Sequence, residues 1–260
     1  LLVSWYRGSG ERSADDVAVY GARLKRGGKE WSEPFLMADT PGFPDGNTAM
    51  FIDSQKRLWL FWPLVIANTW ESCLTQYRVS SDYQRDGSPK WEWQGSIALK
   101  PIDFKDEMLK GFAARQKISE IPLRVRNLEA RKAMLDHKLA TRLGWQPRCK
   151  PTVLPSGRIL LPLYTDTFSV SIMAISDDQG KTWFASKPLA GFGNIQPAVL
   201  RPNDGTLVAY MRENGRLRRI RVAESKDDGI SWGPVGTIDL ANPGSGLDAV
   251  RLANGKWLLI

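Results

Sequence analysis

The stretch Ser176-Asp-Asp-Gln-Gly-Lys-Thr-Trp183 decides the fold, because it recurs as Ser225-Lys-Asp-Asp-Gly-Ile-Ser-Trp232. Both copies read Ser-x-Asp-x-Gly-x-Thr/Ser-Trp, and their tryptophans lie 49 residues apart. Repetition at a fixed period of this length is typical of architectures built from similar stacked units. We therefore look for the other parts of the same unit on either side of these two copies.

A second repeated unit lies beside the first and consists of a short apolar strand, a turn that ends in glycine, and another apolar strand. It occurs at 151–164, 197–212 and 248–260, with a looser copy at 49–62. The turn glycines Gly157, Gly205 and Gly255 are 48 and 50 residues apart. The strands are rich in β-forming residues and are bounded by turn residues, as in β-hairpins. A period near 49 that holds four strands predicts one blade of a β-propeller.

The repeats predict an all-β chain that forms a single domain over 1–260, incomplete at both ends. It would hold the later strands of one blade, three complete blades and the opening hairpin of a fifth. Degenerate turn motifs that end at Trp31 and Trp91 fit the first two of these blades. The chain begins inside the apolar run at Leu1 and ends inside another at Ile260, which indicates a piece of a longer protein.

One segment, 105–143, breaks the period. It is rich in Leu, Ala, Lys, Arg and Glu, and its apolar residues recur at near-helical spacing. We expect a helical insertion that Pro122 interrupts. The segment has ten Lys or Arg and five Asp or Glu, so it holds +5 of the chain's net charge of +8. This local excess favours a solvated face over a surface for anionic polymers, and it argues against a nucleic-acid partner.

The scarce residues exclude further classes of function. The single histidine, His137, rules out two-histidine zinc sites, and we expect it to serve packing or the surface. Cys73 and Cys149 have no metal-ligand spacing, and buried thiols are the more frequent outcome than a disulfide for such a pair. No apolar run approaches eighteen residues, so we expect no membrane span. No metal or organic cofactor is implied.

The Ser-x-Asp-x-Gly-x-Thr-Trp motif resembles the Asp-box of sialidases and related propellers with BNR repeats. In that family the motif forms the turn between the third and fourth strands of a blade, away from the active site. The resemblance therefore implies a six-bladed sialidase-like propeller in which Asp178 and Asp227 are structural. The segments at 5–20, 144–151, 194–200 and 242–248 also look like parts of bacterial sialidase-like proteins.

The resemblance implies a set of catalytic roles. In sialidases three arginines bind the carboxylate of the sugar, a tyrosine attacks the anomeric carbon, a glutamate activates it and an aspartate is the acid. Arg212 matches one arginine by position, whereas the other two arginines and the tyrosine would lie outside this chain. Gln196 stands where the family places its glutamate, and an amide cannot act as a base. The acid would come from the loop that holds Glu11, Asp15 and Asp16.

In a propeller the innermost strands start near the central axis, so residues just before each hairpin converge on one pocket. On this basis the catalytic candidates are Glu11, Asp16, Gln196 and Glu213. The candidates for substrate binding are Arg7, Asn47, Arg148, Lys150, Arg212 and Asp248.

Plainer roles stay open for several of these candidates. Arg212 could pair with Glu213 or with a neighbouring blade, Gln196 could make an ordinary hydrogen bond at a strand start, and Asp248 could cap a turn. Core packing is the default for Tyr164.

The resemblance implies a secreted or periplasmic glycoside hydrolase of exo-α-sialidase type, whose partner is a carbohydrate with a carboxylate. One alternative is a lyase or another carbohydrate-active enzyme that acts on uronate-containing polysaccharides, which the amide of Gln196 favours. Another is a propeller that binds glycans without turnover. A protein-interaction propeller would need an apolar central pocket instead of a charged one.

Overall fold

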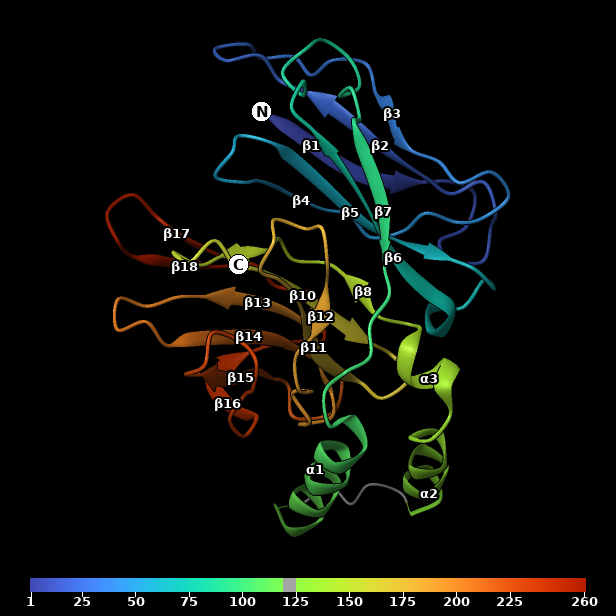
Figure 1. Cartoon of the computed structure of the whole chain (residues 1–260), viewed down its shortest axis with the longest axis vertical. Helices are drawn as coiled ribbons and strands as arrows, with labels where there is room; N and C mark the ends of the chain where they lie inside the picture. The colour runs from blue at the N-terminus through green and yellow to red at the C-terminus, as the bar shows by residue number, and fades with distance from the viewer. Residues whose placement is uncertain (119–124) are drawn as a thin grey trace. The chain divides into compact units, whose positions relative to one another are not determined.

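The computed structural model describes residues 1–118 and 125–260, in which 18 β-strands and three α-helices form (Figure 1). The chain divides into two compact units. Unit 1 comprises Leu1–Ala98 and Trp145–Lys150, and unit 2 comprises Leu99–Gly144 and Pro151–Ile260. The predicted interruption at Pro122 lies outside the described residues.

Unit 1 contains two antiparallel sheets whose strands follow each other in chain order. The first sheet has three strands, β1 (Leu2–Arg7), β2 (Ala18–Arg23) and β3 (Phe35–Ala38). The second has four strands, β4 (Ala49–Ile52), β5 (Leu58–Val65), β6 (Cys73–Ser80) and β7 (Trp93–Ile97). A 3-10 turn (Trp70–Ser72) precedes β6, and β8 (Gln146–Pro147) contacts β5 and β6.

The two sheets of unit 1 pack face to face through apolar side chains. Val19 and Met37 from the first sheet meet Leu60 and Trp62 from the second, and all four are buried. Trp62 also donates a hydrogen bond of 2.7 Å to the buried carboxylate of Asp45. Burying an apolar side chain of this size contributes about 1.5–3 kcal/mol, so this interface stabilises the strand order that positions the loop after β1.

Unit 2 repeats the same meander. β9 (Thr152–Val153), β10 (Ile159–Thr165), β11 (Val170–Ser176) and β12 (Phe184–Ala185) pair in chain order. So do β13 (Asn194–Leu200), β14 (Leu207–Glu213), β15 (Arg219–Ser225) and β16 (Gly236–Ala241). A final hairpin consists of β17 (Ala249–Arg251) and β18 (Trp257–Leu259). Leu160, Met173, Leu207 and Met211 belong to the core cluster that joins the two larger sheets.

The helical insertion is confirmed and belongs to unit 2. Its helices are α1 (Phe104–Ile118), α2 (Val125–Met134) and α3 (Lys138–Arg142). α1 docks through Phe112, whose ring stacks on Phe192 at 4.3 Å between centroids. Gly111 allows this approach, because a Cβ there would lie 2.5 Å from the backbone oxygen of Ala190.

Ion pairs neutralise much of the basic charge on the described part of the insertion. Three lysines pair with carboxylates, Lys105 with Asp136, Lys110 with Glu107 and Lys132 with Glu129. His137 is exposed and caps α3, where its Nδ1 accepts from the amide of Ala140. The expectations of a solvated face and of a surface role for His137 both agree with this arrangement. Of the apolar residues at near-helical spacing in this segment, Leu128 and Leu135 are buried and Met134 and Leu139 are exposed; Leu123 lies outside the described residues.

The predicted hairpins all form where the repeat places them. The four copies correspond to β4–β5, β9–β10, β13–β14 and β17–β18. Cys73 and Cys149 remain buried thiols and form no disulfide, as expected.

The first Ser-x-Asp-x-Gly-x-Thr-Trp motif closes the turn between β11 and β12. Ser176 accepts a hydrogen bond of 2.7 Å from the amide of Gly180, and Asp178 accepts from the amide and the hydroxyl of Thr182 at 2.9 and 2.6 Å. The second motif, between β15 and β16, has the same hydrogen bonds through Ser225, Asp227, Gly229 and Ser231. The expectation that both motifs are structural turns between third and fourth strands is confirmed.

The motif predicts a pH-dependent stability. Hydrogen bonds from Thr182 hold the pKa of Asp178 at about 2, below the usual value of 3.8. A carboxylate whose pKa is depressed by folding stabilises the fold above its unfolded pKa, and this contribution disappears as the pH falls through the folded pKa. We expect Asp178→Asn to be less stable than the wild type at pH 7, and the difference to shrink between about pH 4 and pH 2.

Urea unfolding midpoints between pH 7 and pH 2.5 measure this difference. Asp86→Asn is the matched control, because Asp86 is 89% exposed and lies 3.8 Å from its lysine partner. A difference for Asp178→Asn that stays constant down to pH 2.5 would contradict the structural role of the motif.

One hairpin turn carries lysine where the other three carry glycine. Gly157, Gly205 and Gly255 have φ values of 91°, 87° and 81°, and Lys56 takes the equivalent position with a φ of 61°. A side chain in this left-handed region is strained, whereas glycine is not. We expect Lys56→Gly to stabilise the protein by about 0.5–1 kcal/mol, since relief of strain exceeds the added chain entropy.

The reciprocal variant Gly157→Ala tests the same point in the opposite direction. A Cβ at Gly157 would meet no atom within 4 Å, so only the backbone conformation can penalise it. We expect a loss of about 1 kcal/mol in urea unfolding. Equal midpoints for Lys56→Gly and the wild type would show that the turn tolerates lysine without strain.

Candidate functional site

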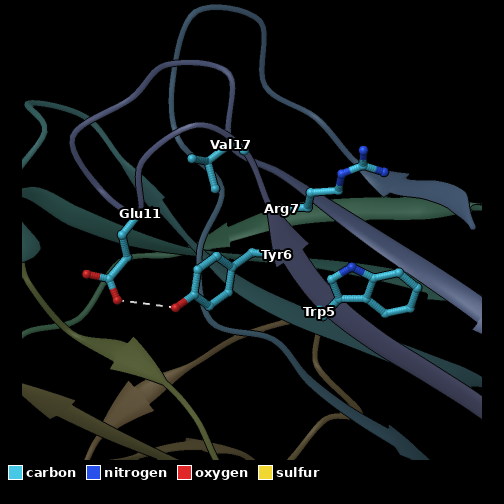
Figure 2. A pocket seen from close by; sticks show the side chains of 6 residues that line it. Trp5, Tyr6, Arg7, Glu11 and Val17 are labelled. Carbon is cyan, nitrogen blue, oxygen red and sulfur yellow. Dashed lines mark hydrogen bonds between the residues drawn. The ribbon is translucent and has the colours of Figure 1, made fainter.

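Unit 1 has a hollow of about 430 Å³ at the end of β1. Its lining consists of Trp5, Tyr6, Arg7, Gly8, Glu11 and Val17 (Figure 2). Successive side chains of a strand point to opposite faces, so Trp5 and Arg7 extend one way and Tyr6 turns toward Glu11 (Figure 2). Gly8 is required here, because a Cβ would lie 2.6 Å from Cγ2 of Val17.

The hydroxyl of Tyr6 and the carboxylate of Glu11 meet in this hollow. Tyr6 donates to Oε1 of Glu11 at 3.2 Å, and Arg12 pairs with Oε2 at 3.1 Å. Burial raises the pKa of Tyr6, the charge and hydrogen bond of Glu11 raise it further, and the nearby charge of Arg148 lowers it. Tyr6 therefore stays protonated and donates a hydrogen bond at neutral pH. Unit 1 thus brings the predicted residues Glu11 and Arg148 near the same phenol.

The loop after β1 is anchored by its own polar side chains. Asp16 accepts hydrogen bonds from the amide and the hydroxyl of Ser9 at 3.0 and 2.8 Å, and these bonds lower the pKa of its carboxyl group. Asn68 donates to Asp15 at 2.9 Å from the far side of the loop. Asp16 therefore closes the loop that presents Glu11, and its predicted catalytic role stays a prediction.

The other binding candidates of unit 1 lie in varied surroundings. Arg7 is exposed and lies 5.8 Å from the ring centroid of Tyr20. Asn47 is buried and donates to the side chain of Gln146 at 3.3 Å. Arg148 is exposed and Lys150 is half-buried. The charge of Arg148 partly offsets the raised pKa of Tyr6, and Arg7 lines the hollow.

Unit 2 brings Gln196 and Arg212 together on neighbouring strands. Gln196 lies at an irregularity of the β13–β14 ladder, between Ile195 and Ala198, and has a φ of 55°. Its amide nitrogen donates to the hydroxyl of Tyr164 at 3.2 Å, and Arg212 donates to its amide oxygen at 3.5 Å. Arg212 also donates to Asn214 at 3.4 Å, while its buried Nε has no hydrogen-bond partner.

Glu213, the neighbour of Arg212, points to the opposite side of β14. Its carboxylate lies 3.1 Å from Arg221 on β15, and both side chains are almost fully buried. The alternative that Arg212 pairs with Glu213 is wrong, because Glu213 pairs with Arg221. The ion pair gives Glu213 a structural role, and its predicted catalytic role stays a prediction.

Asp248 lies at the start of the last hairpin. It is exposed, its backbone pairs with Ile260, and its carboxylate accepts from the amide of Ala249 at 2.7 Å. This is the turn-capping arrangement that was one of the two expectations for Asp248. Its predicted role in binding stays a prediction.

Sequence reasoning missed three residues of these clusters. Tyr6 was not a candidate, Tyr164 was assigned to core packing, and Arg221 was not considered. The one signal for Tyr6 was its place between Trp5 and Arg7 at the end of an apolar strand. The loop that follows contains three acidic residues and one arginine.

Two classes of feature are missing from the described parts of the chain. In residues 1–118 and 125–260, no three His, Cys, Asp or Glu side chains gather closely enough to hold a metal ion. Within the same ranges, no helix has both the length and the apolar character to cross a membrane.

The family model of the BNR repeat-like domain matches residues 1–112 and 138–260 of this chain. No curated protein matches the sequence at a significant level.

Several solved structures match over 99% of this chain, among them these three. A protein of unknown function from Dyadobacter fermentans has a TM-score of 0.69 and 16% identity, over 70% of its own length. The intramolecular trans-sialidase from Ruminococcus gnavus has a TM-score of 0.68 and 12% identity, over 73% of its length. A Hadza microbial sialidase has a TM-score of 0.64 and 17% identity, and this chain spans about half of it, 49%. At such identities the likeness shows the fold, which is that of sialidases.

Proposed function

The chain belongs to the BNR repeat-like family and has a sialidase-like fold, and from this premise we propose that it is a glycoside hydrolase of exo-α-sialidase type. Its substrate would be a glycan that ends in an acidic sugar. The proposal includes a six-bladed propeller as the scaffold and a secreted or periplasmic protein as the setting. It needs no metal or organic cofactor.

The main support for the proposal is the set of hydrogen bonds that Arg212 makes. A guanidinium group prefers a carboxylate, to which it can donate two parallel charge-assisted hydrogen bonds. In the described residues, Arg212 reaches only the amide oxygens of Gln196 and Asn214, at 3.5 and 3.4 Å. The carboxylate of an acidic sugar would supply the partner that this arginine lacks.

The hollow of unit 1 supports binding of a sugar ring. Aromatic side chains beside a few well-placed polar groups are the usual lining of a ligand site, and the hollow combines Trp5 and Tyr6 with Arg7 and Glu11. Within this hollow the hydrogen bond from Tyr6 orients the carboxylate of Glu11, whose predicted catalytic role stays a prediction. Asp16 would act by positioning this loop through Ser9.

A second candidate function is favoured by one observation. The residue that contacts both Tyr164 and Arg212 is the amide of Gln196, which can neither take up nor release a proton at neutral pH. A lyase that acts on uronate-containing polysaccharides, or a protein that binds glycans without turnover, would not need a carboxylate at this position.

The test is to incubate the intact protein with a fluorogenic α-sialoside and to follow the release of the fluorophore. The proposal predicts release that saturates with substrate. If a folded protein gives no release, uronate polysaccharides are the next substrates, and an ultraviolet-absorbing unsaturated product would identify a lyase. Saturable binding of sialosides without any product would identify the glycan-binding function.

A further inference from the structure

The turn between β14 and β15, residues 214–218, carries positive charge that the fold does not neutralise. We call it the basic turn, and its two arginines, Arg216 and Arg218, are both exposed. Neither arginine has a carboxylate within ion-pair distance among the residues that the structure describes. The carboxylate nearest to them in the sequence, Glu213, pairs with Arg221. The basic turn therefore presents two charges that are available to a ligand.

The equivalent turns of the two other large sheets carry no positive charge. The turn after β5, at 66–72, has Glu71 as its one charged residue, and the turn after β10, at 166–169, has Asp166. Because these sheets repeat the same meander, the fold itself does not require arginine at this position. The charge of the basic turn is thus specific to one place in the chain.

The backbone of the basic turn is held at both ends. The amide of Asn214 donates to the oxygen of Gly193 at 2.7 Å, and the oxygen of Arg218 accepts from the amide of Asn242 at 3.0 Å. Arg218 has a φ of 51°, in the left-handed region that penalises a side chain. Strained residues of this kind cluster at functional sites. A turn whose backbone is already fixed also loses little entropy when it binds a ligand.

The basic turn continues the candidate site of unit 2. Arg212 donates to the side chain of Asn214, the first residue of the turn, at 3.4 Å. Leu217 lies between the two arginines and is 42% exposed, so the turn offers apolar surface beside its charges. A chain of sugars that each carry a carboxylate has both repeated negative charge and apolar ring carbons, and it matches this surface. Nucleic acids match it less well, because the turn has no aromatic side chain on which a base could stack.

We propose that the basic turn binds the second and later sugars of an acidic glycan, so that the ligand is a chain of acidic sugars and not a neutral chain with one acidic end. The terminal sugar lies at Arg212 and does not reach Arg216. The ligand class rests on the proposed function, whereas binding by the turn does not require cleavage of a glycosidic bond. Chains of sialic acid and of uronic acid share this chemistry.

The test measures how affinity rises with the length of the chain. Calorimetry on the intact protein compares a single sugar with its tetramer in two series, thio-linked N-acetylneuraminate, which glycosidases do not cleave, and galacturonate. We expect at least one tetramer to bind the wild type about tenfold more tightly than its single sugar, since each exposed ion pair contributes up to about fivefold. This gain should shrink at high ionic strength, because salt screens exposed charges.

The double variant Arg216→Ser/Arg218→Ser should lose most of the gain with chain length. Its matched control is Lys181→Ser/Lys226→Ser, which removes the same charge from two exposed positions in the Ser-x-Asp-x-Gly turns. Lys226 follows β15, at the opposite end of that strand from the basic turn, so the control should keep the gain. Arg216→Glu leaves the strained position unchanged and should also reduce the gain, which keeps the test decisive if the double variant does not fold.

Three results would overturn the inference. The first is equal affinity for single sugar and tetramer in both series, or no binding of either tetramer. The second is a gain that persists in folded Arg216→Ser/Arg218→Ser or in Arg216→Glu. The third is a tetranucleotide that binds as tightly as the acidic tetramers, because the turn would then be an unspecific basic surface.

The outcome is separable from that of the proposed function. Cleavage of an α-sialoside by a protein whose affinity does not rise with chain length would remove the inference alone. A gain for the galacturonate tetramer that the double variant loses, in a protein that cleaves no sialoside, would remove the hydrolase alone.

Discussion

Replacing Arg221 by alanine is expected to lower the free energy of unfolding by about 3–5 kcal/mol, because it leaves the buried carboxylate of Glu213 without its partner. Arg221 is 4% and Glu213 2% exposed. Arg221 also donates to the backbone oxygens of Phe192 and Gly236, at 3.3 and 3.1 Å. Its loss would therefore release both the ion pair and the contact between β15, β16 and the segment before β13.

Thermal and urea unfolding measure this effect, with Arg219→Ala as the matched control on the same strand. Arg219 forms an exposed pair with Asp239 at 3.3 Å, and such surface pairs contribute about 0–1 kcal/mol. The double variant Arg221→Ala/Glu213→Ala should lose less than the sum of the single variants, because the two residues interact directly. A loss below about 1 kcal/mol for Arg221→Ala would show that the pair does not stabilise unit 2.

The second large effect is expected at Arg212. Arg212→Ala should weaken binding of a sialoside roughly 30–150-fold, since hydrogen bonds to a charged group contribute about 2–3 kcal/mol. The fold should keep its stability, because Arg212 is half-buried and its contacts with Gln196 and Asn214 are long. Calorimetry at constant ionic strength measures the affinity, and a thermal melt confirms the fold.

Arg216→Ala is the control for this prediction. Arg216 is exposed in the turn between β14 and β15 and has the same charge, so it separates a specific contact from the general field of the protein. Equal affinities of the Arg212→Ala variant and the wild type would show that the carboxylate of the ligand does not bind to this arginine.

The elements of the fold that could be predicted from sequence are those fixed by local chemistry. The spacing of Gly157, Gly205 and Gly255 located three hairpins, because the left-handed turn they form favours glycine. The fourth hairpin was found although Lys56 occupies the glycine position, since its flanking strands keep their apolar pattern. The two Ser-x-Asp-x-Gly turns follow from hydrogen bonds within a single motif.

The site was harder to predict because its geometry depends on contacts across the sequence. Glu11 faces Tyr6 in a loop that two hydrogen bonds hold in place. Asp16 accepts one from Ser9, and Asn68 donates the other to Asp15, which lies 53 residues away in the sequence. No local pattern encodes that contact. The sequence was therefore sufficient to nominate Glu11 and insufficient to find Tyr6.

The burial of Glu213 could have been predicted from the alternation of buried and half-buried residues along β14. Along β14, Leu207, Ala209, Met211 and Glu213 are buried, whereas the residues between them, including Arg212, are only half-buried. Neighbours on a strand point to opposite faces, so Arg212 and Glu213 could not share a pocket. The nearest basic residue on the buried face of the next strand was Arg221, which the alternation of β15 could have indicated.

The most direct measurement is a crystal structure of the intact protein with N-acetylneuraminate bound. We expect the carboxylate of the sugar to lie about 2.8–3.0 Å from the guanidinium of Arg212, with Gln196 in its present contact with Arg212 and Tyr164. A carboxylate bound away from Arg212, or no bound sugar at saturating concentration, would contradict the assignment of this arginine and with it the proposed substrate.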